Sequence, residues 1–150
     1  MRGSDSRTRT RRPLVVLATL VAMLAASPEA AQATIRSREQ TFAAMVNDTR
    51  ALSLLNRLEL QDNLCDIARR HSRRMAERGR LFHSKLERLL GNGRTSVAEN
   101  VAYGGTLDSA LKGFLGSPPH LENILGDYTM TGVGIVRRDG YLWITQIFAA

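Results

Sequence analysis

The sequence contains one cysteine, Cys65, and one tryptophan among 150 residues. A single cysteine excludes an intramolecular disulfide, so a hydrophobic core must stabilise the fold. Cys65 lies near an apolar stripe, beside Leu64, which favours a buried, inert thiol over a reactive or dimerising one. Aromatic residues are 5% of the chain, and none is interleaved with the arginines. Nucleic acid is therefore a poor candidate partner, because bases need aromatic surfaces on which to stack.

Two catalytic signatures are also missing. The chain has no G-x-S-x-G nucleophile elbow, which disfavours a serine hydrolase. It has no H-E-x-x-H pair that would place two zinc ligands on one helical turn. After the N-terminal segment, no apolar stretch approaches the ~20 residues that a membrane-spanning helix needs.

The N-terminal segment has the pattern of a secretory signal peptide. Five arginines precede an apolar stretch at residues 14–26, and Ala31-Gln32-Ala33 forms an A-x-A cleavage signal. We predict cleavage after Ala33, which divides the chain into a leader, residues 1–33, and one mature domain, residues 34–150. Arg11-Arg12 leaves the twin-arginine route open beside the general one. Part of the formal net charge of +7 belongs to this leader.

Helical spacing of apolar residues predicts helices over residues 38–57 and 62–78, the second ending at Gly79. Residues 85–90 form a further helical turn, followed by a loop at residues 91–93. Strand composition predicts a strand over residues 97–103. Two further helices are expected, one starting at Thr106 with an apolar face through Leu115, and one capped by Ser117 and running to Leu125.

The C-terminal residues predict a β-hairpin, with strands over residues 132–136 and 141–148 and an Asp139-Gly140 turn. The last strand is apolar on both faces, so helices must cover both sides of its sheet. The expected architecture is therefore α+β, a three-layer α-β-α sandwich around a small antiparallel sheet.

Three stretches, taken in order, resemble the signatures of the CAP superfamily (cysteine-rich secretory, venom-antigen and plant pathogenesis-related proteins; SCP domain), in its bacterial single-domain branch. Residues 64–83 resemble its helix that ends in Phe-His, and residues 98–102 resemble its Gly-Glu-Asn motif, with alanine in place of glycine. Residues 117–134 resemble its Ser-x-x-His-Arg-x-Asn-Ile-Leu and Gly-x-Gly motifs, with Leu121 in place of the arginine. The resemblance covers about the last hundred residues and implies the same α-β-α sandwich.

The resemblance also implies a cleft that holds two histidines and two acidic residues. Carried over by motif, these are His83, Glu99 and His120, with Ser117 in place of the second acid. Two imidazoles and a carboxylate suit zinc with an open position, and such a site could activate water for hydrolysis. His83 and His120 are the candidate zinc ligands. Glu99 is a third ligand, a general base and candidate catalytic residue, or only an anchor for loops.

Other polar residues have structural interpretations. His71 falls on an apolar helix face and is expected in the core. Asn100, Asn123 and Gln146 are expected to satisfy buried backbone groups. Arg70, Arg74 and Arg78, four residues apart, form an arginine face that either binds an anionic surface or is merely solvated.

We therefore expect a monomeric protein, secreted or in the cell envelope, that binds a lipid or another, anionic envelope component through this cleft and requires no cofactor. The alternatives are a zinc-dependent hydrolase using the same cleft, and a structural or adhesive protein using the arginine face. Loss of an acid at Ser117 favours binding over catalysis.

Overall fold

The computed structural model describes residues 27–90 and 93–150. The first 26 residues of the predicted leader, and two residues of the predicted loop at 91–93, lie outside this part. The elements follow in the order α1 (Pro28–Leu52), β1 (Glu59–Leu60), α2 (Asp62–Arg78), the 3-10 helix η1 (Leu86–Leu89), β2 (Val97–Gly104), α3 (Leu107–Leu115), α4 (Pro118–Leu125), β3 (Met130–Arg138) and β4 (Tyr141–Ala149).

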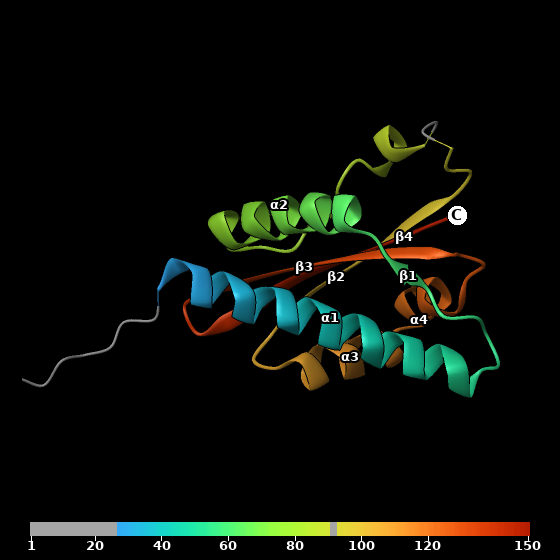
Figure 1. The fold of residues 1–150 in the computed structure, drawn as a ribbon, viewed down its shortest axis with the longest axis horizontal. Helices are drawn as coiled ribbons and strands as arrows, with labels where there is room; N and C mark the ends of the chain where they lie inside the picture. Colours follow the sequence, from blue (N-terminus) through green and yellow to red (C-terminus); the bar gives the residue numbers. More distant parts are fainter. Residues whose placement is uncertain (1–26, 91–92) are drawn as a thin grey trace, which may run out of the picture.

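The strands form one four-stranded sheet in the order β1-β3-β4-β2. The pairs β3–β4 and β2–β4 are antiparallel. β1 is a two-residue strand that pairs with β3 in parallel and was not predicted, because two residues show no periodicity. Helix α2 covers one face of the sheet, and α1, α3 and α4 cover the other (Figure 1). The predicted α+β, three-layer sandwich is confirmed.

Strand β4 is buried on both faces, as its sequence predicts. Leu142, Ile144 and Phe148 pack with α1, α3 and α4 around Phe42 and Phe114. Trp143 and Ile147 point to the other face and pack beneath α2. Because successive side chains of a strand alternate between faces, one strand supplies both halves of the core.

Several local signals give the predicted structure. Asp139 and Gly140 have φ of 51° and 83°, as a tight β-hairpin turn requires. Gly79 ends α2 in the left-handed conformation, with φ of 61°. The Thr106 side chain caps α3 by accepting a hydrogen bond from the Ser109 backbone N–H at 3.1 Å. Ser117 precedes α4 at the capping position, but its side chain makes no capping hydrogen bond.

Helix α1 differs from the predicted range of residues 38–57 at both ends. It begins at Pro28, where the Ser27 hydroxyl accepts a hydrogen bond from the Ala30 backbone N–H, and it therefore runs through the predicted cleavage position after Ala33. It ends at Leu52, because the chain reverses at Leu54, where φ is 60°. Cleavage itself stays a prediction. None of the helices in the described part of the chain is long and apolar enough to cross a bilayer.

Candidate functional site

The candidate site lies along β2, the strand at one edge of the sheet. Glu99 pairs with Ile147 of β4, and Asn100 pairs with Gln146. Ile147 faces α2, so Glu99 points toward α2, and Asn100 points toward the helices on the opposite face. The side chains of these two neighbouring residues therefore lie on opposite faces of the sheet.

Glu99 holds the segment that connects α2 to β2. Its side chain is 1% exposed. Its carboxylate accepts hydrogen bonds from the Ser84 backbone N–H at 2.8 Å and the Ser84 hydroxyl at 2.6 Å. It also accepts one from His83 Nδ1 at 3.0 Å. A buried carboxylate needs such donors, and here they come from the loop, so Glu99 anchors that loop.

The His83 imidazole projects outward from this anchor. Its side chain is 62% exposed. Because an ionised carboxylate only accepts hydrogen bonds, Nδ1 carries the hydrogen in this contact and Nε2 remains available to solvent. The pair presents an oriented imidazole at the surface, supported from below by a buried negative charge.

His120 lies on the other side of β2, on α4. Its backbone carbonyl accepts a hydrogen bond from Asn100 Nδ2 at 2.9 Å, and its ring centroid is 5.0 Å from that of Phe114. Burial, together with the positive charge of His83, holds the pKa of His120 below its usual value of 6.5. Its Nδ1 is buried and has no hydrogen-bond partner among the described residues.

Of the four residues carried over by resemblance, His83 and Glu99 form a direct hydrogen bond. His83 and Glu99 touch, whereas no hydrogen bond within residues 27–90 and 93–150 joins His120 or Ser117 to either of them. In the same part of the chain, no group of three or more His, Cys, Asp or Glu side chains is arranged to hold a metal ion. The geometry of the described residues does not fit the predicted zinc site.

Most residues expected in structural roles have them, but Gln146 does not bond backbone: its Nε2 donates to the Thr131 hydroxyl at 3.2 Å, and its Oε1 has no partner among the described residues. His71 is fully buried; its Nδ1 lies 3.0 Å from Arg74 Nη2, and its Nε2 lies 2.6 Å from the Phe82 carbonyl oxygen. Since an arginine only donates, Nδ1 accepts and Nε2–H donates. Asn123 donates to the Glu99 carbonyl oxygen at 3.3 Å, and Cys65 is buried, which raises the pKa of its thiol.

A groove opens beside His83, between α2 and the segment of residues 82–89. Its volume is about 710 Å³. Apolar side chains from both walls line it, namely Ile67, Phe82, Leu86 and Leu89. Its basic side chains are Arg70, Arg74, Arg78, Lys85 and Arg88, and no acidic residue is among the described residues that line it.

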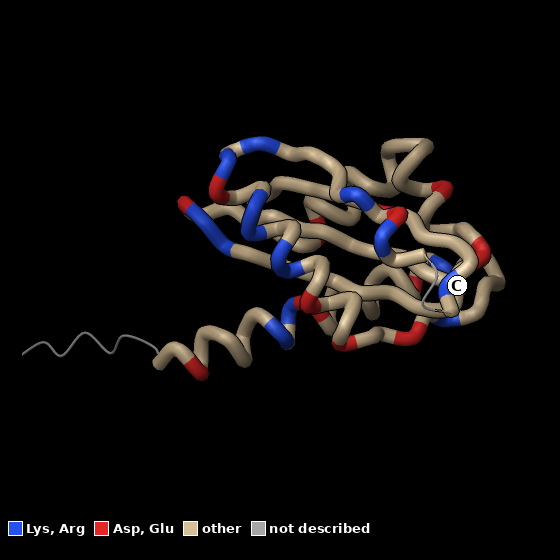
Figure 2. Tube along the Cα trace, turned by 90° about the horizontal axis from the view of Figure 1, so that it is seen from above, with Lys and Arg blue, Asp and Glu red and all other residues tan. Residues whose placement is uncertain are grey.

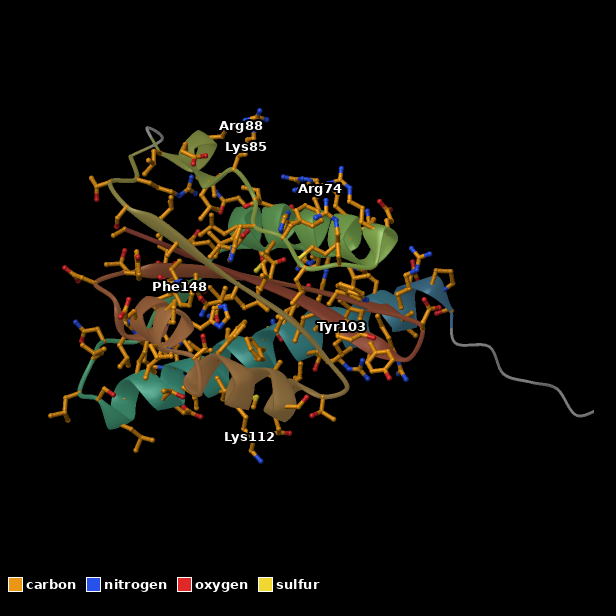
Figure 3. All side chains as sticks on the ribbon, turned by 180° about the vertical axis from the view of Figure 1, so that it is seen from behind. Arg74, Lys85, Arg88, Tyr103, Lys112 and Phe148 are labelled. Carbon is orange, nitrogen blue, oxygen red and sulfur yellow. The ribbon has the colours of Figure 1, made fainter. Side chains whose placement is uncertain are left out.

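These cations gather on one side of the molecule. Basic residues follow one another along α2 when the molecule is seen from above that helix (Figure 2). Arg74, Lys85 and Arg88 project on the side of α2 and η1, whereas Lys112 of α3 projects on the opposite side (Figure 3). The arginine face predicted from Arg70, Arg74 and Arg78 is thus one wall of a groove.

Sequence reasoning missed the second wall. The segment contains two pairs in which a basic residue precedes a leucine, Lys85-Leu86 and Arg88-Leu89. The two pairs are three residues apart, a spacing that indicates an amphipathic helical turn. Arg69, which adjoins the arginine face in sequence, is not part of this wall. It binds the buried carboxylate of Glu39 through Nη2 at 2.6 Å, so its charge is structural.

Comparison with known protein families places these features in context. The sequence model of the cysteine-rich secretory protein family, CAP, matches residues 43–148. This match includes α2, the His83–Glu99 pair, α4 and the closing hairpin. A comparison with curated protein sequences returned no significant match.

Three solved bacterial structures share the fold. An extracellular protein containing a SCP domain from Bacillus anthracis matches with a TM-score of 0.71 and 24% identity over 83% of this chain and 44% of that protein. An outer surface protein from Borrelia burgdorferi matches with a TM-score of 0.66 and 19% identity, over 73% of this chain and 90% of that protein. A cysteine-rich secretory protein from Staphylococcus aureus matches with a TM-score of 0.61 and 20% identity, over 97% of this chain and 44% of that protein. The chain thus spans less than half of two of these proteins.

Proposed function

Because this chain belongs to the cysteine-rich secretory protein family, we propose that it acts outside the cytoplasm as a binding protein for an anionic amphiphile, such as a lipid of the cell envelope. The groove between α2 and residues 82–89 is the proposed binding site. The observation that carries the proposal is the combination of five cations with an apolar lining in one concave surface.

The cations of the groove are available to a ligand. The ion pairs of the described residues involve other arginines, namely Arg57, Arg69 and Arg138, and none of the groove's basic side chains. Arg78 lies over the Phe82 ring, with Cζ 4.9 Å from the centroid, and Arg74 is held beside His71. Guanidinium groups positioned in this way match phosphate or carboxylate groups in shape and charge.

The apolar residues of the groove explain why an amphiphile fits better than a simple anion. Ile67, Leu86 and Leu89 are partly buried and pack against the core cluster beneath α2. An acyl chain laid over them would remove further apolar surface from water, at roughly 25 cal/mol per Å². The charged headgroup would meanwhile remain at the basic rim.

Binding is better supported than hydrolysis. Glu99, the candidate general base, already accepts three hydrogen bonds from Ser84 and His83 and is enclosed. A base must reach the proton that it removes, and this carboxylate faces its own loop. The adhesive alternative uses the same arginines, but it predicts an affinity that does not depend on whether the ligand has an acyl chain.

The proposal is tested with a single-chain lipid, lysophosphatidylglycerol, against lysophosphatidylcholine of the same acyl chain, by calorimetry on the purified protein. We expect the anionic lipid to bind more tightly and to weaken as salt rises, since surface charges are screened. The double variant Lys85→Glu/Arg88→Glu should lose roughly tenfold or more in affinity, because each change replaces attraction by repulsion.

Lys112→Glu is the matched control, since it reverses the same charge on the opposite side of the molecule (Figure 3). It should leave binding unchanged. Equal affinity for the two lipids, or an intact affinity in the double variant, would overturn the proposal. Equally tight binding of polyphosphate, which has no acyl chain, would favour the adhesive alternative instead.

A further inference from the structure

A second concave surface lies where β2 ends and the β3–β4 hairpin turns. Tyr103 of β2 stacks on Tyr141 of β4, with ring centroids 4.7 Å apart and an interplanar angle of 25°. Tyr103 also contacts Trp143, its partner in the strand register, at 4.5 Å between centroids. We call Tyr103, Tyr141 and Trp143 the aromatic platform.

The aromatic platform is open to solvent on one side. Tyr103 is 45% exposed and Tyr141 46%, whereas Trp143 is 7% exposed and lies beneath them. Leu81, from the turn after α2, is also 45% exposed and lines the same pocket. A small protein rarely leaves large apolar side chains grouped at one surface point without a use for them.

A shallow pocket of about 390 Å³ adjoins the platform. Tyr103 and Trp143 line one side of it, the turn after α2 supplies Arg80 and Leu81, and the hairpin turn supplies Asp139. None of the residues that line this pocket lines the groove of the proposed function, although the two adjoin where Arg80 Cζ lies 5.5 Å from the ring centroid of Phe82.

The chemistry of this pocket differs from that of the basic groove. Its lining includes one cationic side chain, Arg80, and one carboxylate, Asp139, beside aromatic rings, so it carries charges of both signs. The Asp139 carboxylate is 89% exposed and lies 3.5 Å from Arg138 Nε, which leaves oxygen lone pairs free to accept further hydrogen bonds. A strongly charged ligand of either sign would meet both attraction and repulsion here.

A neutral sugar ring matches this combination. The face of a pyranose that carries C–H groups can cover an aromatic ring, which removes apolar surface of both from water. Its hydroxyl groups can donate to a carboxylate and accept from a guanidinium, and such charge-assisted hydrogen bonds are the stronger ones. Aromatic lining with a few convergent polar groups is typical of small-ligand sites.

We propose that the aromatic platform, with Arg80 and Asp139, binds a short segment of a neutral glycan. The platform supplies the stacking surface, and the two charged side chains fix the orientation of the ring through its hydroxyl groups. This proposal does not rest on the proposed lipid groove, because the two sites share no lining residue.

The chain carries its own reporter for the test. Trp143 is the sole tryptophan of the sequence and lines the pocket, so its fluorescence reports occupancy. Titration of the purified protein with a soluble chitin oligosaccharide should give a saturable change in Trp143 emission. Tyr103→Ala should weaken binding by roughly tenfold or more, since it removes the central ring of the stack.

Two variants separate ligand binding from folding. Tyr103→Phe keeps the ring and should retain binding. Asp139→Asn should weaken binding severalfold while it keeps the turn, because asparagine tolerates the positive φ at this position. The groove variant Lys85→Glu should bind the oligosaccharide as the parent does.

Three results would overturn the proposal. The first is the absence of any change in Trp143 emission at the highest soluble oligosaccharide concentration. The second is an affinity that survives both Tyr103→Ala and Asp139→Asn. The third is a response to phosphatidylglycerol vesicles without a response to oligosaccharide, which would assign the platform to a membrane surface instead.

Discussion

The Glu99 carboxylate accepts two hydrogen bonds from Ser84, one from the Ser84 backbone N–H at 2.8 Å and one from the Ser84 hydroxyl at 2.6 Å. Ser84 belongs to the connection between α2 and β2, which also carries the second wall of the groove. A buried carboxylate on a strand thus fixes the position of a surface loop that has little secondary structure of its own.

We expect Glu99→Ala to lower the free energy of unfolding by about 1–3 kcal/mol, because the half-buried Ser84 loses the partner of its backbone N–H and of its hydroxyl. The protection of the loop amides against hydrogen exchange should fall as well. Denaturant unfolding measures the first effect. Glu87→Ala, on the exposed face of η1, is the control and should stay within about 0.5 kcal/mol of the parent. A Glu99→Ala variant as stable as the parent would contradict the anchoring role.

Stability should also depend on the protonation of His120. Its pKa is lowered in the folded protein, first by burial and then by the charge of His83. The unfolded chain therefore takes up a proton near pH 6.5 while the folded protein keeps the imidazole neutral. The stabilising contribution is present above about pH 6.5 and is lost as the pH falls below it.

The measurement is the free energy of unfolding between roughly pH 7.5 and pH 5, in the parent and in His120→Gln. The parent should lose more stability than the variant over this range, since the variant has no imidazole to protonate. Parallel curves would show that His120 does not contribute to the pH dependence.

Zinc titration tests the arrangement of the cleft. No metal-binding group of three side chains forms among the residues that the structure describes, and His83 Nδ1 is already bound to Glu99. We expect calorimetry with Zn²⁺ to show no tight one-to-one site. Tight binding that both His83→Ala and His120→Ala abolish would place the two imidazoles in one site. It would then favour the zinc-dependent hydrolase over the binding protein.

Close packing of α2 on β3 depends on Gly134. A Cβ at this position would collide with the backbone of Ala68 and Arg69. Gly134→Ala should therefore destabilise the fold by about 1–3 kcal/mol or more, because backbone atoms cannot move aside as a flexible side chain can. Gly113→Ala in α3 meets nothing within 4 Å and should stabilise by up to about 1 kcal/mol. Thermal unfolding of the two variants compares them directly, and a Gly134→Ala protein that melts with the parent would contradict this packing.

Much of the fold is determined by patterns that act within a few residues. The Asp139-Gly140 turn, the left-handed Gly79 and the Thr106 cap all satisfy backbone groups of their own neighbourhood. The two apolar faces of β4 require helices on both sides of the sheet, which gives the three layers. The ordered motifs around His83, Glu99 and His120 identify the family. Each of these signals is present in the sequence because its physical cause is local or periodic.

Other features were decided only when distant segments came together. Arg69 belongs to an arginine-rich helix by sequence, yet it forms an ion pair with Glu39, thirty residues away in the chain. Glu99 faces α2, whereas the neighbouring Asn100 faces the opposite layer and binds the His120 carbonyl, since adjacent strand residues face opposite layers. The basic groove needs α2 and residues 82–89 side by side, and the aromatic platform needs β2 beside β4. Such pairings depend on burial, strand register and close packing, which no short stretch of sequence specifies by itself.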